Sequence, residues 1–336
     1  KSKILQNVRL MMTLQLNDKY DYTSVLGQTN GLEPDKVKGR GLVKGNPPLE
    51  FHTVLSLEAE NDFERVNKLK QLFQQMNLNW KGKRARQIPC VPEQLSLELF
   101  CSSHEVKKLI ARGELPFAYD LAEAELLELP LSSATYTILG HKGMGKTNLL
   151  KVLLKIMKEL NGLKVYVVDN AKKQMQGFCS ICPPDQYICE QSRLEELLEA
   201  LNNEMVAYRE AAITTEAEEP RGTQRHIILV DDFCSFFEML SGKYVNIMEQ
   251  IVSGDFQNVH AVFTAEPAEL SRYRTKSLYR HIFNGIQGIL LGGRVDSQNV
   301  FSPKMNYRER DITMDPGQGY LFEKSNNYKI IKVPEA

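Results

Sequence analysis

The sequence has 336 residues, and its 42 Lys and Arg balance 42 Asp and Glu, so the formal net charge at neutral pH is zero. A chain without net charge lacks the excess of basic residues that is typical of proteins that bind nucleic acid or anionic membranes in general. With 42% apolar and 25% charged residues, the composition is that of a folded globular protein and excludes a disordered one. The length suggests about two domains.

Cysteine usage and hydropathy point to the compartment. Six cysteines are too few for a disulfide framework, and no apolar run reaches the ~20 residues that a membrane-spanning helix needs. The N-terminus does not resemble a secretory signal, so we expect a soluble chain in a reducing cytoplasm. Because the chain begins with Lys1 and not with Met, we also expect it to be a piece of a longer polypeptide.

The first quarter of the chain is expected to be strands and loops without a helical layer of its own. Residues 8–16 alternate in a strand-like way, turn residues follow at 17–19, and residues 49–55 read as a second strand. Helical spacing of apolar residues begins only at 62–76. The segment 81–92, rich in Pro and basic residues, is the expected domain boundary.

Beyond this boundary, strands and helices alternate in a βαβ pattern that predicts an α/β fold. The predicted strands are 126–131, 135–139, 164–168, 226–230, 259–264, 288–292 and 320–333, and the predicted helices are 105–111, 148–160, 194–208 and 245–252. A polar connector at 213–224 precedes the strand that ends in two aspartates.

Residues 140–147 read GHKGMGKT and match the P-loop pattern G-x-x-x-x-G-K-[ST] at every fixed position, between a predicted strand and a predicted helix. Its glycines let consecutive backbone N–H groups point into one concavity, and the helix N-terminus adds a favourable dipole for phosphate. In such a loop Lys146 reaches the β- and γ-phosphates, and the Thr147 hydroxyl ligates Mg²⁺. The expected ATP-binding residues are Gly140, His141, Lys142, Gly143, Met144, Gly145, Lys146, Thr147 and Asn148.

A second element supports an ATP site. The apolar run HIILV at 226–230 is followed by Asp231 and Asp232, as in a Walker B strand whose first acid holds Mg²⁺ and whose second orients the attacking water. We therefore expect Thr147 and Asp231 as metal residues and Asp232 as the catalytic residue. The alternative is that one of the two aspartates only caps the next helix. Asp232 is one methylene shorter than the Glu that usually activates water, which favours binding over turnover.

Several further segments match one known family. VYVVDNAK (165–172), LQLNDKYDYTSVLG (14–27), GRGLV (39–43), LEFH (49–52) and a W-x-G-x-R…I-P-x-V-P-E stretch (Trp80, Gly82, Arg84, Ile88, Pro89, Val91, Pro92, Glu93) carry the resemblance. The chain resembles the FtsK/SpoIIIE superfamily of RecA-like P-loop ATPases, and within it the C-terminal part of the EssC/EccC-type ATPases of type VII secretion systems.

The resemblance implies an architecture. Residues 1–85 would be the strand-rich end of a preceding ATPase domain, 86–102 a linker, and 103–336 a complete C-terminal domain with a central, mostly parallel sheet flanked by helices. It also implies a membrane-anchored protein at the cytoplasmic face, with the anchor outside this chain. Partners implied are small helical export substrates of the WXG100 type and other subunits of the same ATPase in a hexamer, with no specific nucleic acid.

Departures from the family pattern bear on hydrolysis. Where translocating members end a strand in A-T-Q to sense the γ-phosphate, this chain has Thr264, Ala265 and Glu266. Together with Asp232, this predicts weak or absent hydrolysis. Two alternatives stay open: a DNA-translocating ATPase of the same superfamily, and a non-hydrolysing scaffold or substrate-docking domain.

Three other groups of residues give weaker evidence of a function. Cys179 and Cys182 form a C-x-x-C, but a structural zinc ion needs four ligands, so we interpret the pair as part of a loop. The arginines at 40, 272, 274 and 280 are candidates for an arginine finger and are interpreted as surface residues. The basic run 81–87 lacks interleaved aromatic residues and is interpreted as a solvated linker face.

Overall fold

The computed structural model describes residues 8–83, 90–130, 133–214, 224–254, 256, 258–284, 287–323 and 327–336, apart from the side chains of 180, 181 and 208–214. The chain divides into two compact units, Lys1–Arg86 and Gln87–Ala336. Part of the predicted linker, residues 86–89, and most of the predicted polar connector lie outside the described residues. Among the described helices, none is both long and apolar enough to span a membrane.

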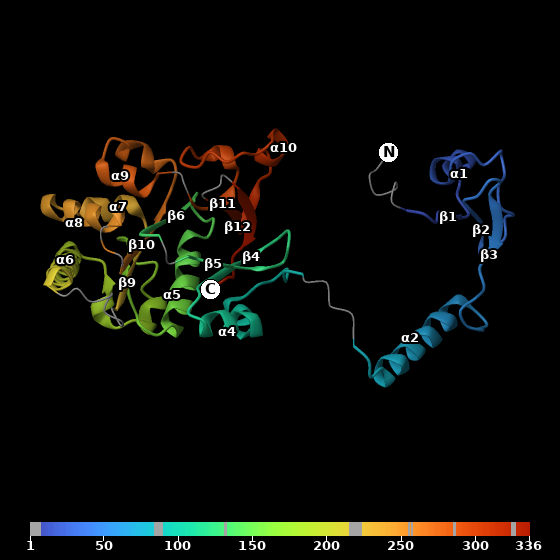
Figure 1. Ribbon diagram of the computed structural model, residues 1–336, viewed down its shortest axis with the longest axis horizontal. Coiled ribbons are helices and arrows are strands. Elements are labelled where there is room, and N and C mark those ends of the chain that lie inside the picture. The colour runs from blue at the N-terminus through green and yellow to red at the C-terminus, as the bar shows by residue number, and fades with distance from the viewer. Residues whose placement is uncertain are drawn as a thin grey trace. The chain divides into compact units, whose positions relative to one another are not determined.

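The first unit contains a small antiparallel sheet with a helix packed on it (Figure 1). Its elements are β1 (Met12–Leu14), α1 (Lys19–Leu26), β2 (Arg40–Val43), β3 (Leu49–His52) and α2 (Asp62–Asn79). Tyr22 and Leu26 of α1 bury against Leu42 of β2, so the expectation of no helical layer is wrong. The Asp18 side chain, taken as a turn signal, accepts a hydrogen bond from Tyr20 N at 2.9 Å and caps α1.

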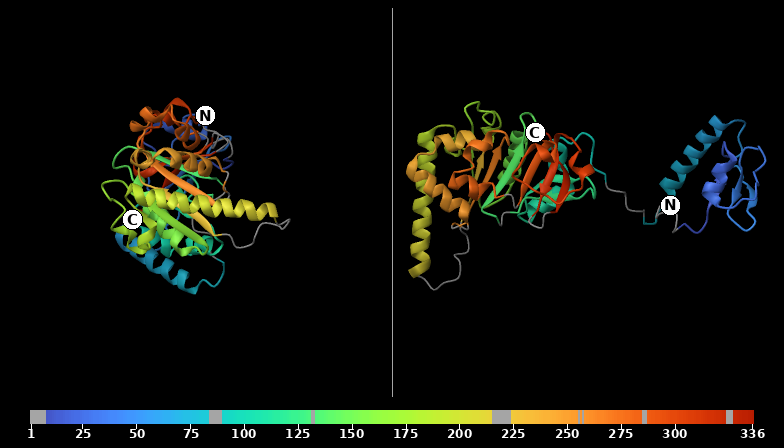
Figure 2. Two further views of the ribbon diagram at one scale, coloured as in Figure 1. Left: turned by 90° about the vertical axis from the view of Figure 1, so that its left-hand side faces the viewer. Right: turned by 90° about the horizontal axis from the view of Figure 1, so that it is seen from above.

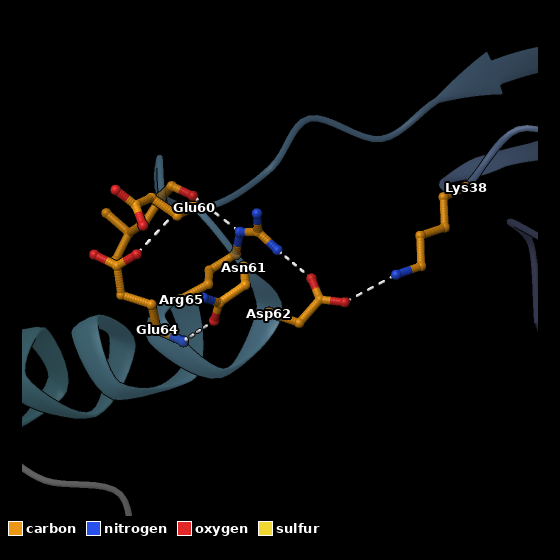
Figure 3. A network of polar contacts seen from close by, with 7 residues as sticks. Lys38, Glu60, Asn61, Asp62, Glu64 and Arg65 are labelled. Carbon is orange, nitrogen blue, oxygen red and sulfur yellow. Dashed lines mark hydrogen bonds and ion pairs between the residues drawn. The ribbon is translucent and has the colours of Figure 1, made fainter.

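Polar contacts fix the start of α2 (Figure 3). Asn61 Oδ1 accepts from Glu64 N at 2.9 Å, and Glu64 Oε2 reaches back to Glu60 N at 2.9 Å, so two backbone donors at the helix start are satisfied. The Asp62 carboxylate pairs with Arg65 one turn on and with Lys38 Nζ at 2.8 Å from the loop before β2. The helix is therefore anchored by its polar first turn, while none of its side chains is buried.

The second unit is built on a ten-stranded sheet of order β5-β4-β13-β12-β11-β6-β10-β9-β7-β8 (Figure 1). Strands β11, β6, β10, β9, β7 and β8 run parallel, and β12, β13, β4 and β5 extend this sheet with antiparallel pairings. The strands are β4 (Pro116–Asp120), β5 (Leu126–Glu128), β6 (Thr135–Gly140), β7 (Leu163–Val168), β8 (Tyr187–Ile188), β9 (Arg225–Val230), β10 (Val259–Ala265), β11 (Gly288–Gly293), β12 (Met314–Phe322) and β13 (Tyr328–Lys332). The expected α/β fold is confirmed.

Helices cover both faces of this sheet, and each face has its own apolar core (Figures 1 and 2). One core contains buried residues of α3 (Leu97–Ser102), α4 (His104–Ala111) and α5 (Lys146–Glu159), and the other contains those of α6 (Gln191–Thr214), α7 (Phe233–Met239), α8 (Gly242–Ser253) and α9 (Ser277–Ile282). A single turn, α10 (Tyr307–Arg310), precedes β12. In Figure 2 the C-terminal end of α6 extends beyond the sheet.

The residues that lead into α3 pair with the residues after β13, and this pairing, called here the strap, was not predicted from the sequence. Leu97 N donates to Glu335 O at 2.7 Å, and Glu335 N donates to Leu95 O at 2.8 Å, so the segment that leads into α3 pairs with the residues after β13. Leu97 and Phe100 of α3, within the predicted linker, are buried in the core beneath α5. Residues 95–102 are thus part of the second unit.

Candidate functional site

The loop between β6 and α5 has the backbone that a phosphate cradle requires. Gly145 is the N-cap of α5 and has φ of 102°, a left-handed conformation that glycine adopts without strain. Gly140 lies against the neighbouring strand β11, where an added Cβ would come 2.8 Å from Leu291 O. These two positions let the loop turn tightly at the edge of the sheet and direct the first N–H groups of α5 outward.

Lys146 folds back over its own loop. Its Nζ donates to Gly140 O at 2.7 Å and to His141 O at 3.0 Å, so the ammonium group lies above the loop concavity. Burial lowers the pKa of Lys146, and the nearby carboxylates of Glu266 and Asp231 oppose that shift. The ammonium group is partly desolvated and close to where the loop would hold an anion.

Asp231 is the centre of the polar network at this edge. Its carboxylate accepts from the Thr147 hydroxyl at 3.1 and 3.2 Å, from the Thr264 hydroxyl at 3.2 Å and from Asn170 Nδ2 at 3.0 Å. The side chain is buried, and this burial raises its pKa to about 6, with the charge of Asp169 adding to the shift. The predicted metal residues Thr147 and Asp231 are therefore in direct contact.

Asp232 turns away from this network. It has a left-handed backbone with φ of 78°, and its carboxylate caps α7 by accepting from Cys234 N at 3.3 Å and from Ser235 N at 3.1 Å. The Ser235 hydroxyl also donates to it. This is the capping arrangement that the sequence left open as the alternative for one of the two aspartates.

The end of β10 supplies the third strand of the site. Thr264 is fully buried and joins both aspartates, because its hydroxyl donates to Asp231 and accepts from Asp232 N at 2.8 Å. Ala265 is buried and contributes no polar group. Glu266 lies 3.9 Å from His141 Nδ1 of the loop, which places an acid beside the phosphate-binding segment.

A cavity of about 700 Å³ connects these groups, and its lining includes side chains outside the predicted site residues, among them Arg272, which we interpreted as a surface residue. Asn170, Lys172 and Arg272 line it together with Lys146 and Asp231. Asn170 follows β7 at the same sheet edge at which β9 ends, and it lies within the segment VYVVDNAK (165–172) that carries the family resemblance. Arg274 and Arg280 are not among its lining residues.

The remaining loop residues have distinct places. Lys142 and Gly143 line the cavity. Met144 packs against the core on the α5 face, and its side chain occupies the space that a Cβ on Gly292 would need. The Asn148 side chain donates to Pro334 O at 2.7 Å and accepts from Ala336 N at 2.8 Å, so it holds the chain after β13.

The cysteine pair lies apart from any complete ligand set. A hydrogen bond between the Cys179 and Cys182 thiols lowers the pKa of Cys182 to about 7 and raises that of Cys179. Within the described residues, the side chains close enough to share a metal ion are Asp232, Cys234 and Glu269, and neither member of the pair belongs to that group. Cys179 lies in a short 3₁₀ helix (Phe178–Ile181) and not in a loop, and both cysteines are buried in the core on the α5 face.

The curated proteins that are similar to this chain include secretion-system proteins of Geobacillus and Staphylococcus. No family model matches the chain. The ESX secretion system protein EccC of Geobacillus thermodenitrificans is 21% identical over 345 residues, covering 97% of this chain and 22% of that protein. The type VII secretion system protein EssC of Staphylococcus aureus is 24% identical over 136 residues, 40% of this chain and 9% of that protein. The chain thus spans about a fifth of the length of the first relative and less of the second.

Solved structures agree on the fold. EssC (ATPases 2 and 3) from Geobacillus thermodenitrificans superposes with a TM-score of 0.74 at 18% identity, over 99% of this chain and 62% of that one. Thermomonospora curvata EccC (ATPases 2 and 3), solved in complex with a signal sequence peptide, gives a TM-score of 0.53 at 14% identity, over 90% and 54%. The relatives and solved structures named here are thus EssC and EccC proteins, and the chain has the fold of the second and third ATPase domains of EssC.

Proposed function

We propose that residues 103–336 bind Mg-ATP, with the phosphates in the loop Gly140–Thr147. The observation that carries this proposal is the contact between Thr147 of the loop and Asp231 of the neighbouring strand, at 3.1 Å. A hydroxyl and a carboxylate at this distance, beside a half-buried lysine and a helix N-terminus, match the needs of a metal-bound triphosphate. The solved EssC and EccC structures named above are of ATPase domains, which supports the same interpretation.

The donor set fits Mg²⁺. Thr147 Oγ1 and the Asp231 carboxylate are hard oxygen ligands, the kind that Mg²⁺ binds alongside phosphate oxygens and water. When bound, the ion would neutralise charge on the phosphates. Asp231 has its pKa raised by burial, and a nearby cation would offset that desolvation and favour the ionised carboxylate. Lys146 would exchange its contacts with the loop carbonyls for contacts with phosphate oxygens.

Hydrolysis is proposed to be weak or absent. A water-activating acid directs a carboxylate oxygen at the attacking water, whereas the Asp232 carboxylate, although it lines the cavity, caps the start of α7 through both of its oxygens. Ala265 adds no polar group next to Thr264 at the end of β10. Asp232 thus remains the proposed catalytic residue only for slow turnover, in which its cap would have to open.

The larger assignment rests on the relatives. We propose that the chain is a module of a type VII secretion ATPase anchored in the membrane through parts outside residues 1–336, at the cytoplasmic face. Residues 1–85 would be the end of a preceding ATPase domain, and the linker after them would end before residue 95, because residues 95–102 belong to the second unit. Nucleotide state would be coupled, within a hexamer, to recognition of WXG100-type substrates. The Thermomonospora EccC was solved in complex with a signal sequence peptide, which supports a peptide segment as the kind of partner.

Isothermal titration of Mg-ATP into the full chain tests the proposal. We expect micromolar or tighter binding that is lost in Lys146→Ala, because that variant removes the cation of the loop. Lys155→Ala is the matched control, since Lys155 is a half-exposed lysine of the same helix that pairs with Glu159 at 3.5 Å. Binding that survives Lys146→Ala, or no binding by the unaltered chain, would contradict the site.

A further inference from the structure

Cys179 and Cys182 lie in a short turn whose geometry suits a disulfide. The turn is the 3₁₀ helix Phe178–Ile181 with Cys182 directly after it, and Cys182 N donates to Cys179 O at 2.8 Å. A backbone hydrogen bond of this kind holds the two Cα atoms within about 7 Å of each other, and disulfides join Cα atoms about 4.4–6.8 Å apart. The two thiols are also hydrogen-bonded to each other. The sulfur atoms can therefore bond without unfolding of the turn.

The two thiols differ in acidity. The hydrogen bond from Cys179 and the nearby ammonium group of Lys158 on α5 lower the pKa of Cys182 to about 7, against the opposing effect of burial. The same hydrogen bond, burial and the charge of Cys182 raise the pKa of Cys179. The thiolate is the nucleophilic form of cysteine. Cys182 is therefore the attacking thiol of the pair, and Cys179 is its resolving partner.

A small oxidant can reach the pair. Cys179 and Cys182 are 7% and 9% exposed, so neither thiol is completely enclosed by the core on the α5 face. Hydrogen peroxide, which is little larger than water, needs no wider opening. Burial raises the pKa of the Cys101 and Cys234 thiols, which makes them poorer nucleophiles than Cys182.

We propose that Cys179 and Cys182 form a redox site that takes a small peroxide as its substrate and closes to a reversible disulfide. This inference does not rest on the proposed nucleotide site. The Cys182 thiolate attacks one peroxide oxygen, and the O–O bond breaks. The leaving hydroxide takes up a proton and becomes water. The product at Cys182 is an uncharged sulfenic acid.

The resolving step follows from the loss of charge at Cys182. The Cys182 thiolate raises the pKa of Cys179, and the sulfenic acid no longer carries that charge. Cys179 then gives up its proton and attacks the Cys182 sulfur. An S–S bond forms, and the hydroxyl group of the sulfenic acid leaves with the proton as a second water. Two thiols are thereby oxidised to a disulfide while one peroxide is reduced to two waters.

The disulfide would stiffen the segment between β7 and β8. Met175 O accepts from Cys179 N at 2.9 Å, and Met175 N donates to the Asp169 carboxylate at 2.9 Å. The Tyr187 hydroxyl donates to the same carboxylate oxygen at 2.8 Å, so Asp169 holds both ends of the segment that contains the pair. Asn170, at the start of this segment, lines the cavity beside the phosphate-binding loop. A cross-link next to Met175 would restrict local opening of this wall.

Hydrogen peroxide treatment of the full chain, followed by mass spectrometry of unreduced peptides, tests the proposal. A Cys90→Ser background removes the exposed thiol that could link two chains. We expect a disulfide between Cys179 and Cys182, a loss of two thiols per chain, and recovery of both with dithiothreitol. The pair should react roughly tenfold faster than Cys101 and Cys234, because only Cys182 has a lowered pKa among these thiols.

Single variants in this background separate the two roles. Cys179→Ser should stop at the sulfenic acid of Cys182, which dimedone traps as a stable adduct. Cys182→Ser should leave Cys179 unmodified at the same peroxide concentration. Cys189→Ser is the matched control, since Cys189 is a half-buried cysteine beyond the turn, and it should form the disulfide as the unaltered chain does. A dimedone adduct on Cys179 in Cys182→Ser, with none on Cys182 in Cys179→Ser, would contradict the assigned roles.

Hydrogen exchange provides an independent readout. The amides of Met175 and Cys179 form the hydrogen bonds that connect the pair to Asp169. Their exchange should slow in the oxidised chain and recover after reduction. A disulfide from Cys182 to Cys189, or oxidation of the pair no faster than that of Cys101 and Cys234, would overturn the redox site. Unchanged exchange in a chain with the expected disulfide would overturn the stiffening of the segment.

Discussion

The Thr264 hydroxyl donates a hydrogen bond to Asp231 Oδ1 at 3.2 Å and accepts one from Asp232 N at 2.8 Å. One fully buried side chain on β10 thus fixes the turn that follows β9 and directs the two aspartates to different tasks. Asp231 faces the loop, and Asp232 faces the start of α7. The stability of this part of the fold should therefore depend on pH and on single polar atoms of these side chains.

Asp231→Asn should stabilise the ligand-free protein at neutral pH. Burial raises the Asp231 pKa from 3.8 to about 6, so the folded state binds the proton more tightly than the unfolded state between these values. Stability therefore falls as the pH rises through this window and stays lower above it. The variant lacks this penalty, and we expect a gain of up to about 3 kcal/mol at pH 8.

The measurement is urea unfolding of both proteins at pH 8 and at pH 5 with a chelator present. The gain should shrink at pH 5, where the native carboxyl is mostly protonated in the fold. Addition of Mg-ATP at pH 8 should reverse the order, since ligand binding stabilises only the protein that can hold the metal. A difference that does not change with pH would rule out the buried charge as its cause.

Thr264→Val should destabilise the fold although it preserves the shape of the side chain. The substitution leaves Asp232 N without its acceptor and removes one donor from Asp231, and a buried polar group left unpaired costs about 1–3 kcal/mol. Thr264→Ser keeps the hydroxyl and should lie closer to the native protein in thermal unfolding. If the serine variant proves the less stable of the two, packing of the methyl group outweighs the hydrogen bonds.

Variants of Asp232 separate capping from catalysis. Asn caps helices as well as Asp and tolerates a left-handed backbone, so Asp232→Asn should unfold within about 0.5 kcal/mol of the native protein. Asp232→Ala should lose about 1–2 kcal/mol because the cap is removed. If the carboxylate only caps α7, any slow ATP turnover should be unchanged in Asp232→Asn. A large loss of turnover in that stable variant would instead identify a catalytic residue.

Much of the second unit could be predicted from sequence because its elements carry strong local signals. Residues 227–230 form a continuous apolar run, as in buried parallel strands, and residues 135–139 (TYTIL) are rich in β-branched and aromatic residues. They lie in β9 and β6. The pattern of 140–147 predicts a turn before a helix, and α5 begins at Lys146. Here local pattern and global fold agree, so little tertiary information was needed.

The unpredicted features depend on contacts between segments distant in sequence. Nothing local indicates that Asn170 donates to Asp231, because the two residues meet only when β7 and β9 pair. The same holds for the strap between Leu97 and Glu335, which joins the two ends of the second unit. The Asp232 carboxylate caps α7 because the residue has a positive φ of 78°, and no local sequence pattern indicates that conformation. Site geometry was thus harder to predict than the fold.

Gly140→Ala tests whether the close approach of the loop to β11 is needed for the site. An added Cβ would come 2.8 Å from Leu291 O, a backbone atom that cannot rotate away, so the loop or the strand must move. We expect a loss of about 1–3 kcal/mol in unfolding free energy and weaker Mg-ATP binding. Gly177→Ala is the matched control, because its Cβ would have no atom within 4 Å and its φ of −63° suits alanine. Equal behaviour of the two variants would show that the loop can shift without cost, and the cradle would then owe its shape to the loop itself and not to the strand beside it.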